Sequence, residues 1–221
     1  MCLIVVGWRA HPVYQLIVAA NRDEFHSRSA APAAFWADRP NILAGRDLQA
    51  MGTWMGVSRR GKFAAVTNYR GAREPSAAES RGALVTKYLA DGALPGAYAA
   101  EVAGRGALYS GFNLLVADRE ELWWMSNRDG APRRLEPGYY ALGNLLLDSP
   151  DVQPVKARVA DLPPAVEALF SAVGAAKILN PEYGTRCSTV LLDSGNDMRY
   201  AERSYEPDGS EGATLHFHFS T

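Results

Sequence analysis

The residue best suited to chemistry in this sequence stands at its second position. In the opening stretch MCLIVV, Cys2 follows Met1 directly and begins an apolar run. If Met1 is removed, Cys2 carries a thiol and a free α-amine on one residue. An α-amine with a pKa of about 7.7–8.0 can accept the proton of a thiol with a pKa of about 8.5. The position therefore indicates a nucleophile with its own general base, against the plainer interpretation of a small core residue.

Four consecutive polar residues, NRDE at Asn21 to Glu24, follow the second apolar run of the chain. Charged side chains at the end of a buried strand are costly unless they find partners. Arg22 can lower the pKa of the Cys2 thiol and hold a substrate carboxylate or carbonyl, and Asp23 can hydrogen-bond and orient the α-ammonium group. The alternative is an Arg22–Asp23 ion pair that only stabilises a loop.

Two asparagines end apolar stretches in matching positions. Asn68 closes AAVTN, and Asn144 closes YYALGN. A side-chain amide can donate a hydrogen bond to the oxyanion that develops in acyl transfer. Asparagine is also a common turn former. The matching positions favour a shared role for Asn68 and Asn144 at a catalytic site.

The elements that must position these residues are predicted as strands with helices gathered in the middle. We expect strands at 2–6, 14–20, 52–58, 62–68, 112–118, 121–127, 138–144, 188–194, 198–206 and 213–220. We expect helices at 79–92, 96–104 and within 152–175, the last interrupted at Pro163 and Pro164. This order, without repeats or linkers, predicts one α+β domain over residues 1–221.

The first two strands are predicted to form a β-hairpin. If Gly7 and Tyr14 close its turn, antiparallel pairing sets Cys2 opposite Ala19, and residues 21–24 emerge beside the thiol. Both strands are apolar on their two alternating faces, which is typical of strands covered on both sides. We therefore expect two antiparallel sheets packed face to face and covered outside by the helices.

Composition excludes several classes of partner. The net charge of −1 gives no electrostatic footprint for nucleic acid or an anionic membrane. No stretch approaches 18 apolar residues and no signal peptide precedes the first strand, so we expect a cytoplasmic protein with no integral membrane association. Cys2 and Cys187 stand in different contexts and predict neither a disulfide nor a metal site, and Cys187 is expected to be buried.

Several motifs carry a resemblance to a known family. The motifs are MC at the start, NRDEF, GTWMGVSRRGKFAAVTNYR and GTRCSTVLLD. Together they resemble the NRDE-motif family, the proteins similar to Transport and Golgi organisation protein 2. The match runs over nearly the whole chain with its motifs in order.

The resemblance implies a fold and a nucleophile. That family resembles the cysteine N-terminal nucleophile hydrolases, such as penicillin V acylase and bile-salt hydrolase, whose fold is a four-layer αββα sandwich. Cys2 then stands at the position of their nucleophile. Arg22 and Asp23 resemble their arginine and aspartate, but the local order and spacing differ, which leaves either Asp23 or Glu24 as the orienting acid.

The resemblance also implies roles for three later residues. Asn68 resembles the asparagine that holds the oxyanion in those hydrolases, and Asn144 resembles a later asparagine of their sites. Arg186, in TRCSTVLL, resembles an arginine that precedes a late strand. Its alternative role is to pair with a buried carboxylate.

Two functions from different classes follow. The first is an amidohydrolase that acts on a small amide or acylated amine, without a cofactor or metal. The second is a non-enzymatic carrier of haem or an acyl ligand on the same fold, because the family has been linked to haem handling and lipid metabolism. His216 and His218 share one face of the last strand, but no third ligand stands nearby, and Trp123 and Trp124 are expected to pack in the core and at the surface.

Overall fold

The computed structural model describes residues 2–71 and 78–221. Contacts divide the chain into two compact units. The first unit holds the residues up to Arg28 together with Pro137–Gly143 and Leu147–Thr221, and the second holds Ser29–Glu136 and Asn144–Leu146. Each unit contains one antiparallel sheet and one pair of α-helices, which confirms the expected α+β class with two antiparallel sheets.

The sheet of the first unit has six strands in the order β10-β1-β2-β11-β12-β13. Their bounds are β1 (Leu3–Trp8), β2 (Leu16–Phe25), β10 (Gly138–Leu142), β11 (Tyr183–Asp193), β12 (Asp197–Tyr205) and β13 (Glu211–Ser220). β1 lies between β10 and β2, so the apolar strand at the start of the chain is internal, as expected. Placing it at an exposed edge would leave its backbone groups open to other chains.

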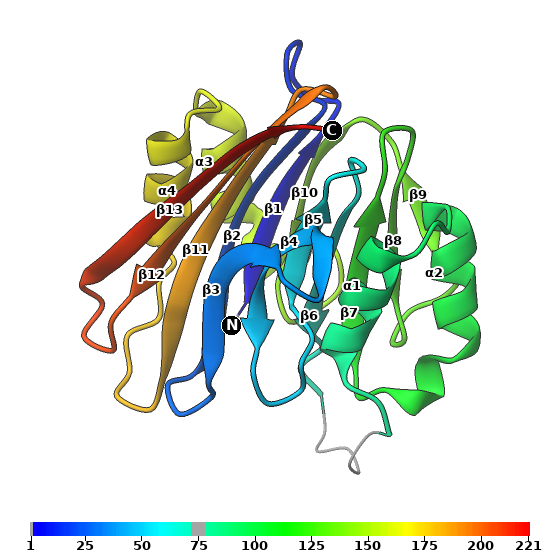
Figure 1. Ribbon diagram of the computed structural model, residues 1–221, viewed down its shortest axis with the longest axis horizontal. Helices are drawn as coiled ribbons and strands as arrows, with labels where there is room; N and C mark the ends of the chain where they lie inside the picture. Colours follow the sequence, from blue (N-terminus) through cyan, green and yellow to red (C-terminus); the bar gives the residue numbers. More distant parts are fainter. Residues whose placement is uncertain (1, 72–77) are drawn as a thin grey trace. The chain divides into compact units, whose positions relative to one another are not determined.

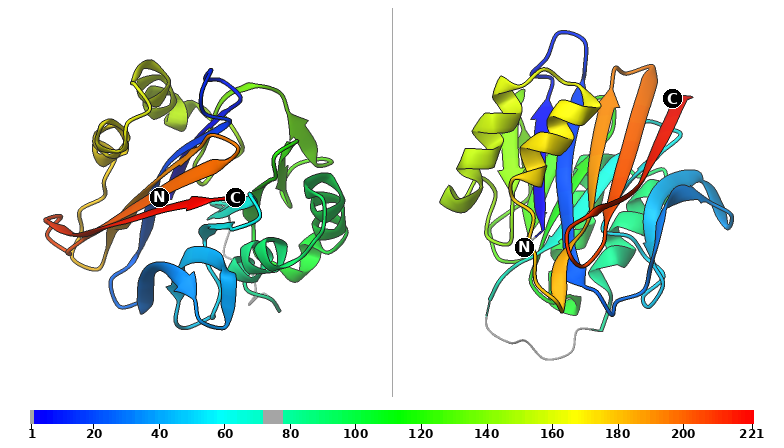
Figure 2. Two further views of the ribbon diagram at one scale, coloured as in Figure 1. Left: turned by 45° about the horizontal axis from the view of Figure 1, so that its top comes forward. Right: turned by 90° about the vertical axis from the view of Figure 1, so that its left-hand side faces the viewer.

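Two helices cover one face of this sheet, α3 (Gln153–Asp161) and α4 (Val166–Gly174), after a short 3-10 turn, η2 (Pro150–Val152). Figures 1 and 2 show both helices lying along β1 and β2. Phe170 of α4 and Val159 of α3 pack with Val5, Ile17 and other apolar residues of the strands. Ile4, Val18 and Leu191, on the opposite face of the same strands, are also buried, which explains why β1 and β2 are apolar on both faces.

The sheet of the second unit has seven strands in sequence order, β3 to β9. Their bounds are β3 (Ala30–Trp36), β4 (Arg39–Asp47), β5 (Met55–Ser58), β6 (Phe63–Asn68), β7 (Phe112–Ala117), β8 (Leu122–Ser126) and β9 (Arg133–Leu135). The unit also contains α1 (Arg81–Ala90), α2 (Pro95–Gly104) and a 3-10 turn, η1 (Gly106–Leu108). β3, β4 and β9 were not expected, because Pro32, the alanine-rich stretch around it and the mixed polarity of β4 hide the alternation of a strand.

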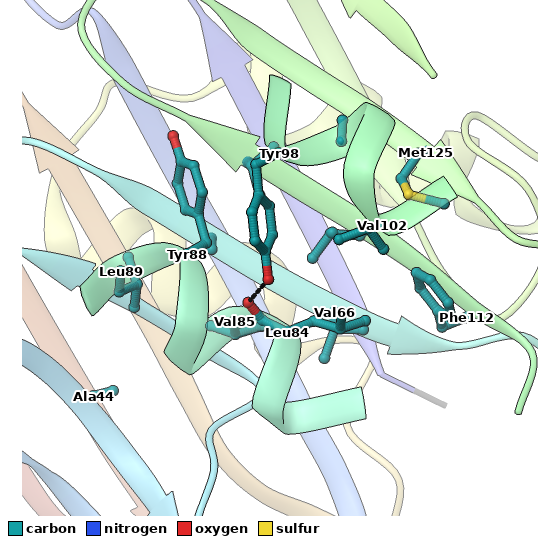
Figure 3. Close-up of a cluster of buried hydrophobic side chains, with 14 of the residues drawn as sticks. Ala44, Val66, Leu84, Val85, Tyr88, Leu89, Tyr98, Val102, Phe112 and Met125 are labelled. Atoms are coloured by element: carbon teal, nitrogen blue, oxygen red, sulfur yellow. Dashed lines mark hydrogen bonds between the residues drawn. The ribbon is translucent and has the colours of Figure 1, made fainter. Parts of the chain in front are cut away.

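Figure 3 shows the core between the helices and the sheet of the second unit. Tyr88 and Tyr98 lie there side by side with a ring-centroid distance of 5.2 Å. The Tyr98 hydroxyl donates to the backbone carbonyl of Leu84 at 2.7 Å, which joins α2 to α1. Trp124 is fully buried and Trp123 packs partly buried against the same cluster, as expected for core and surface packing.

We expect Tyr98→Phe to lower the free energy of unfolding by about 1–2 kcal/mol, because the buried Leu84 carbonyl loses a donor. Urea unfolding of the variant and the parent measures the difference. Tyr14→Phe, on a half-buried tyrosine of the first unit, is the matched control. Equal midpoints for Tyr98→Phe and the parent would show that the bond between the helices contributes nothing.

The first hairpin departs from its expected register. Leu3 pairs with Asn21 and Val5 with Ala19, so Ala19 does not lie opposite Cys2. The connection is longer than expected: the Arg9 amide donates to the carbonyl of Gln15 at 2.7 Å, and Tyr14 lies in the loop. Continuing the ladder by one residue brings Cys2 beside Arg22, closer to the NRDE motif than the expected register did.

Gly7 does not form the turn either. It lies inside β1, where a Cβ would come within 2.7 Å of the Tyr139 ring. A glycine in a strand often marks such a close approach. The NRDE motif is likewise part of β2 and does not follow the strand, since β2 continues to Phe25.

Candidate active site

The candidate nucleophile lies at the start of β1, against the NRDE segment of β2. Cys2 is half-buried, and its Sγ donates to the backbone carbonyl of Asp23 at 3.5 Å. The Tyr183 hydroxyl, on β11, donates to the same carbonyl at 3.2 Å. The residue that precedes β1 and a tyrosine of β11 therefore share one backbone oxygen of β2.

Asp23 is held inside this cluster. The residue is 3% exposed, and its Oδ1 accepts a hydrogen bond from Thr185 Oγ1 at 2.6 Å. Burial raises the pKa of the Asp23 carboxyl above its usual range, while the Thr185 hydrogen bond and the Arg22 charge act in the opposite direction. A carboxylate kept in such a place is typical of a functional group, because its burial costs stability.

Glu24 has different surroundings. Its Oε2 lies 3.9 Å from Arg22 Nη2 and 3.8 Å from Arg28 Nε, so it bridges two arginines. Glu24 is also more exposed than Asp23. Of the two acids left open by the sequence, Asp23 is the one whose backbone carbonyl accepts from the thiol and whose charge acts on the thiol pKa. Its role as the orienting acid stays a prediction.

Burial raises the pKa of the Cys2 thiol to about 11, and the Asp23 charge adds to the increase. The Asp23 carbonyl and the charge of Arg22 lower it by less. The charge of Arg22 acts in the expected direction, but in the chain that still carries Met1 the loss of hydration outweighs it. The depressed pKa expected once Met1 is removed stays a prediction. Cys187 is buried as expected, and burial raises its thiol pKa well above the ordinary value.

The thiol pKa predicts the reactivity of the chain that still carries Met1. At neutral pH we expect iodoacetamide to alkylate Cys2 about 100-fold more slowly than a thiol of pKa 9.0, and the rate to rise with pH up to about 11. Peptide mapping after timed alkylation measures this rate. A rate that levels off near pH 9 would contradict the burial of the thiol. The processed chain is expected to react faster at neutral pH, and much faster than Cys187.

The two candidate asparagines meet in the second unit. Asn68 is exposed at the end of β6, and Asn144 follows β10 along the chain. Asn144 Nδ2 donates to the backbone carbonyl of Asn68 at 2.6 Å, and the Asn144 carbonyl accepts the amide of Arg70. The structure therefore brings these two residues together, as their matching positions suggested, and their role at the oxyanion stays a prediction.

Arg186 stands at a β-bulge of β11, where the pairing with β2 shifts between Thr185 and Cys187. Its Nη1 lies 3.0–3.3 Å from the backbone carbonyls of Phe25, His26 and Arg28. These contacts tie the turn after the NRDE strand to β11. They differ from the carboxylate pairing considered above, and a catalytic role for Arg186 stays a prediction.

The two histidines of the last strand have separate surroundings. His218 Nε2 lies 2.6 Å from Asp197 Oδ1, and His216 is exposed. Within residues 2–71 and 78–221, no group of three histidine, cysteine or acidic side chains is placed to hold a metal ion. The histidine pair therefore gives no support to a metal site.

Sequence reasoning missed two residues of this cluster, Thr185 and Tyr183. Both reach Asp23 from β11, which pairs with β2 although more than 150 residues separate them. Their only signal is their place in YGTRCSTVLLD, the stretch that also carries Arg186. Pairing between strands so distant in the chain is not visible in local periodicity.

A family model described as Transport and Golgi organisation 2 matches residues 1–163. The chain belongs to this family. Its relatives include the Transport and Golgi organization protein 2 homologs of Bos taurus, 35% identical over 92% of this chain and 93% of that protein, and of Homo sapiens, 33% identical over 100% and 99%. The resemblance carried by the NRDE motifs is thereby confirmed.

Solved structures similar to this member of the Transport and Golgi organisation 2 family are N-terminal nucleophile hydrolases. They include a Caenorhabditis elegans N-acylethanolamine-hydrolyzing acid amidase ortholog, with a TM-score of 0.57 and 14% identity over 86% of this chain and 92% of that one. Penicillin V acylase from Agrobacterium tumefaciens gives a TM-score of 0.57 and 14% identity over 92% and 83%.

A mutant conjugated bile acid hydrolase from Clostridium perfringens gives a TM-score of 0.58 and 9% identity over 98% of this chain and 92% of that one. At these identities the likeness shows the fold alone, and it confirms the expected fold class. None of the helices in the described ranges has the length and hydropathy needed to cross a membrane.

Proposed function

We propose that this protein is a cysteine N-terminal nucleophile amidohydrolase acting on a small amide or acylated amine. The observation that carries the proposal is the contact of Cys2 Sγ with the carbonyl of Asp23, whose buried carboxylate is held by Thr185. The fold shared with an acid amidase, an acylase and a bile acid hydrolase supports it. In this proposal Met1 is removed and Cys2 becomes the first residue.

The reaction proceeds in two halves. The α-amine of Cys2 takes the thiol proton, and Sγ attacks the amide carbon. The Asn68 amide, with Asn144 behind it, donates to the oxygen that becomes negative. The C–N bond then breaks as the α-ammonium group gives its proton to the leaving amine. The acyl group stays on Sγ as a thioester. The α-amine of Cys2 then takes a proton from water, which attacks the thioester carbon. The carboxylic acid leaves, and the α-ammonium group returns the proton to Sγ.

Asp23 and Arg22 have supporting roles in these steps. The Asp23 carboxylate hydrogen-bonds the α-ammonium group and orients it toward the thiol and the leaving amine. Arg22, which is 9% exposed, supplies a positive charge that favours the thiolate and holds a substrate carbonyl or carboxylate.

The test compares two forms of the chain that differ only in where the α-amine stands. The first is the parent with Met1 removed, as shown by intact mass. The second carries one additional alanine between Met1 and Cys2, so that processing leaves the thiol in place and moves the amine one residue away. Both are assayed against acyl amides that differ in acyl chain and amine, and both are titrated with haem and with acyl ligands.

We expect hydrolysis by the processed parent and its loss in the alanine-insertion form. Equal hydrolysis by both forms would contradict the α-amine as general base. Tight haem or acyl-ligand binding by both forms, with hydrolysis by neither, would overturn the proposal in favour of a carrier on the same fold.

A further inference from the structure

The carboxylate of Asp23 accepts a hydrogen bond from Thr185, a residue outside the NRDE motif. Thr185 lies directly opposite Asp23 in the pairing of β11 with β2, and both residues are 3% exposed. Thr185 Oγ1 lies 2.6 Å from Asp23 Oδ1. The backbone amide of Ile178 donates to the same Thr185 oxygen at 2.9 Å, and the Thr185 amide donates to the Ile178 carbonyl at 3.0 Å.

These contacts fix the direction of the hydrogen bonds. A backbone amide can only donate, so the Thr185 oxygen accepts from Ile178. The single hydroxyl proton of Thr185 is then the one that points to Asp23 Oδ1. Asp23 Oδ1 is therefore an acceptor, and its side chain cannot rotate without breaking a buried bond to a charged group.

The segment that holds Thr185 is itself anchored. Ile178 lies between α4 and β11, and Asn21 Nδ2 donates to the carbonyl of Val173, near the end of α4, at 2.8 Å. Ser188 Oγ donates to Asn21 Oδ1 at 2.7 Å, farther along β11. Asn21, the first residue of the NRDE motif, thus bonds to the end of α4 and also to β11, the two elements that flank Ile178. A buried hydrogen-bond network of this kind restricts the positions of its side chains.

We propose that Thr185 is a positioning residue for the reaction of Cys2, fixing Asp23 Oδ1 so that the carboxylate is presented to the α-amine in one orientation. This inference rests on the proposed function, because the α-amine is the group that Asp23 orients. In this inference Thr185 acts through Asp23 and not by direct contact with the reacting atoms. Its effect is expected on the rate of the chemical step and not on substrate binding.

The Thr185 hydroxyl also affects the pKa of the Asp23 carboxyl. Its hydrogen bond favours the ionised carboxylate and opposes the effect of burial on the Asp23 pKa, as does the nearby Arg22 charge. The titratable groups at Asp23 include the α-amino group of the chain, which also lowers the Asp23 pKa, and the Cys2 thiol and Tyr183 hydroxyl, which contact its carbonyl. Loss of the Thr185 hydroxyl is therefore expected to raise the Asp23 pKa while these neighbours stay unchanged.

Thr185→Val, which keeps the shape and loses the hydroxyl, is compared with Thr185→Ser, which keeps the hydroxyl. Thr86→Val is the matched control, since Thr86 is a buried threonine of α1 whose hydroxyl donates to the carbonyl of Gly82 in the same helix. Two readouts are used: carboxyl ¹³C titration of labelled aspartate, with Asp23→Asn to assign the signal, and kcat and KM on an amide that the parent hydrolyses.

In Thr185→Val we expect the Asp23 titration to move to higher pH and kcat to fall about 10- to 100-fold at nearly constant KM. Thr185→Ser should restore both, and Thr86→Val should match the parent. If the valine variant does not fold, Thr185→Ala takes its place. A folded variant without the hydroxyl whose Asp23 titration equals that of the parent would overturn the inference. Because titration needs no turnover, a parent without hydrolysis would count against the proposed function alone.

Discussion

Replacing Cys2 with alanine is expected to lower amide hydrolysis by the processed chain at least about 10⁴-fold, to the level of the uncatalysed reaction. Alanine keeps the α-amine and the first residue but removes the atom that forms the thioester. The half-buried position of Cys2 and its lack of a role in the cores of either unit predict that the variant folds like the parent. Initial rates on the best amide of the panel give the measurement.

Cys2→Ser tests the same assignment with a weaker nucleophile in place of the thiol. A hydroxyl is a poorer nucleophile than a thiol at neutral pH, so we expect a small residual activity between those of the parent and the alanine variant. Hydrolysis in Cys2→Ala within tenfold of the parent would show that another residue attacks the amide, and the assignment of the nucleophile would fail.

Asp23→Asn is expected to change two properties of Cys2 in opposite directions. Hydrolysis by the processed chain should fall about 100-fold or more, because a neutral amide no longer holds the α-ammonium group in place. Alkylation of Cys2 in the unprocessed chain should become severalfold faster at neutral pH, since the Asp23 charge that raises the thiol pKa is gone. Urea unfolding of the variant is measured alongside, because a loss of structure would also expose the thiol, lower its pKa and speed its alkylation.

Asp197→Asn is the control for this pair of assays. Asp197 is a carboxylate of the same unit that contacts His218 at the opposite edge of the sheet from β1. Its variant should resemble the parent in both hydrolysis and alkylation. Slower alkylation of Cys2 in Asp23→Asn would contradict the effect of the Asp23 charge on the thiol pKa, and unchanged hydrolysis would contradict its role as the orienting acid.

The sequence allowed the fold to be predicted where the pattern is local. The apolar runs of β1, β2, β6 and β7, and the polar residues at their ends, are found close to where alternation and turn residues placed them. The NRDE motif was also placed beside Cys2, although by an incorrect register. The hairpin loop from Arg9 to Gln15 is longer than its glycine and proline suggested, because Gly7 is needed inside the strand to accommodate Tyr139.

The contacts that hold Asp23 in place could not be predicted in this way. They come from Thr185 and Tyr183 on β11, which is separated from β2 along the chain by β3 to β10 and the helices between them. The raised thiol pKa was missed for a related reason. The cation at Arg22 is visible in the sequence, whereas the loss of hydration around Sγ depends on how β1, β2 and β11 pack together.

The central claim is that the nucleophilic thiol and the general base belong to one residue, and the intact mass of the active protein tests it most directly. The protein is purified at its natural expression level, its hydrolytic fraction is isolated, and its mass is measured alongside the N-terminal peptide. We expect a mass lower by one methionine, with Cys2 as the first residue. A fully active fraction that retains Met1 would contradict it.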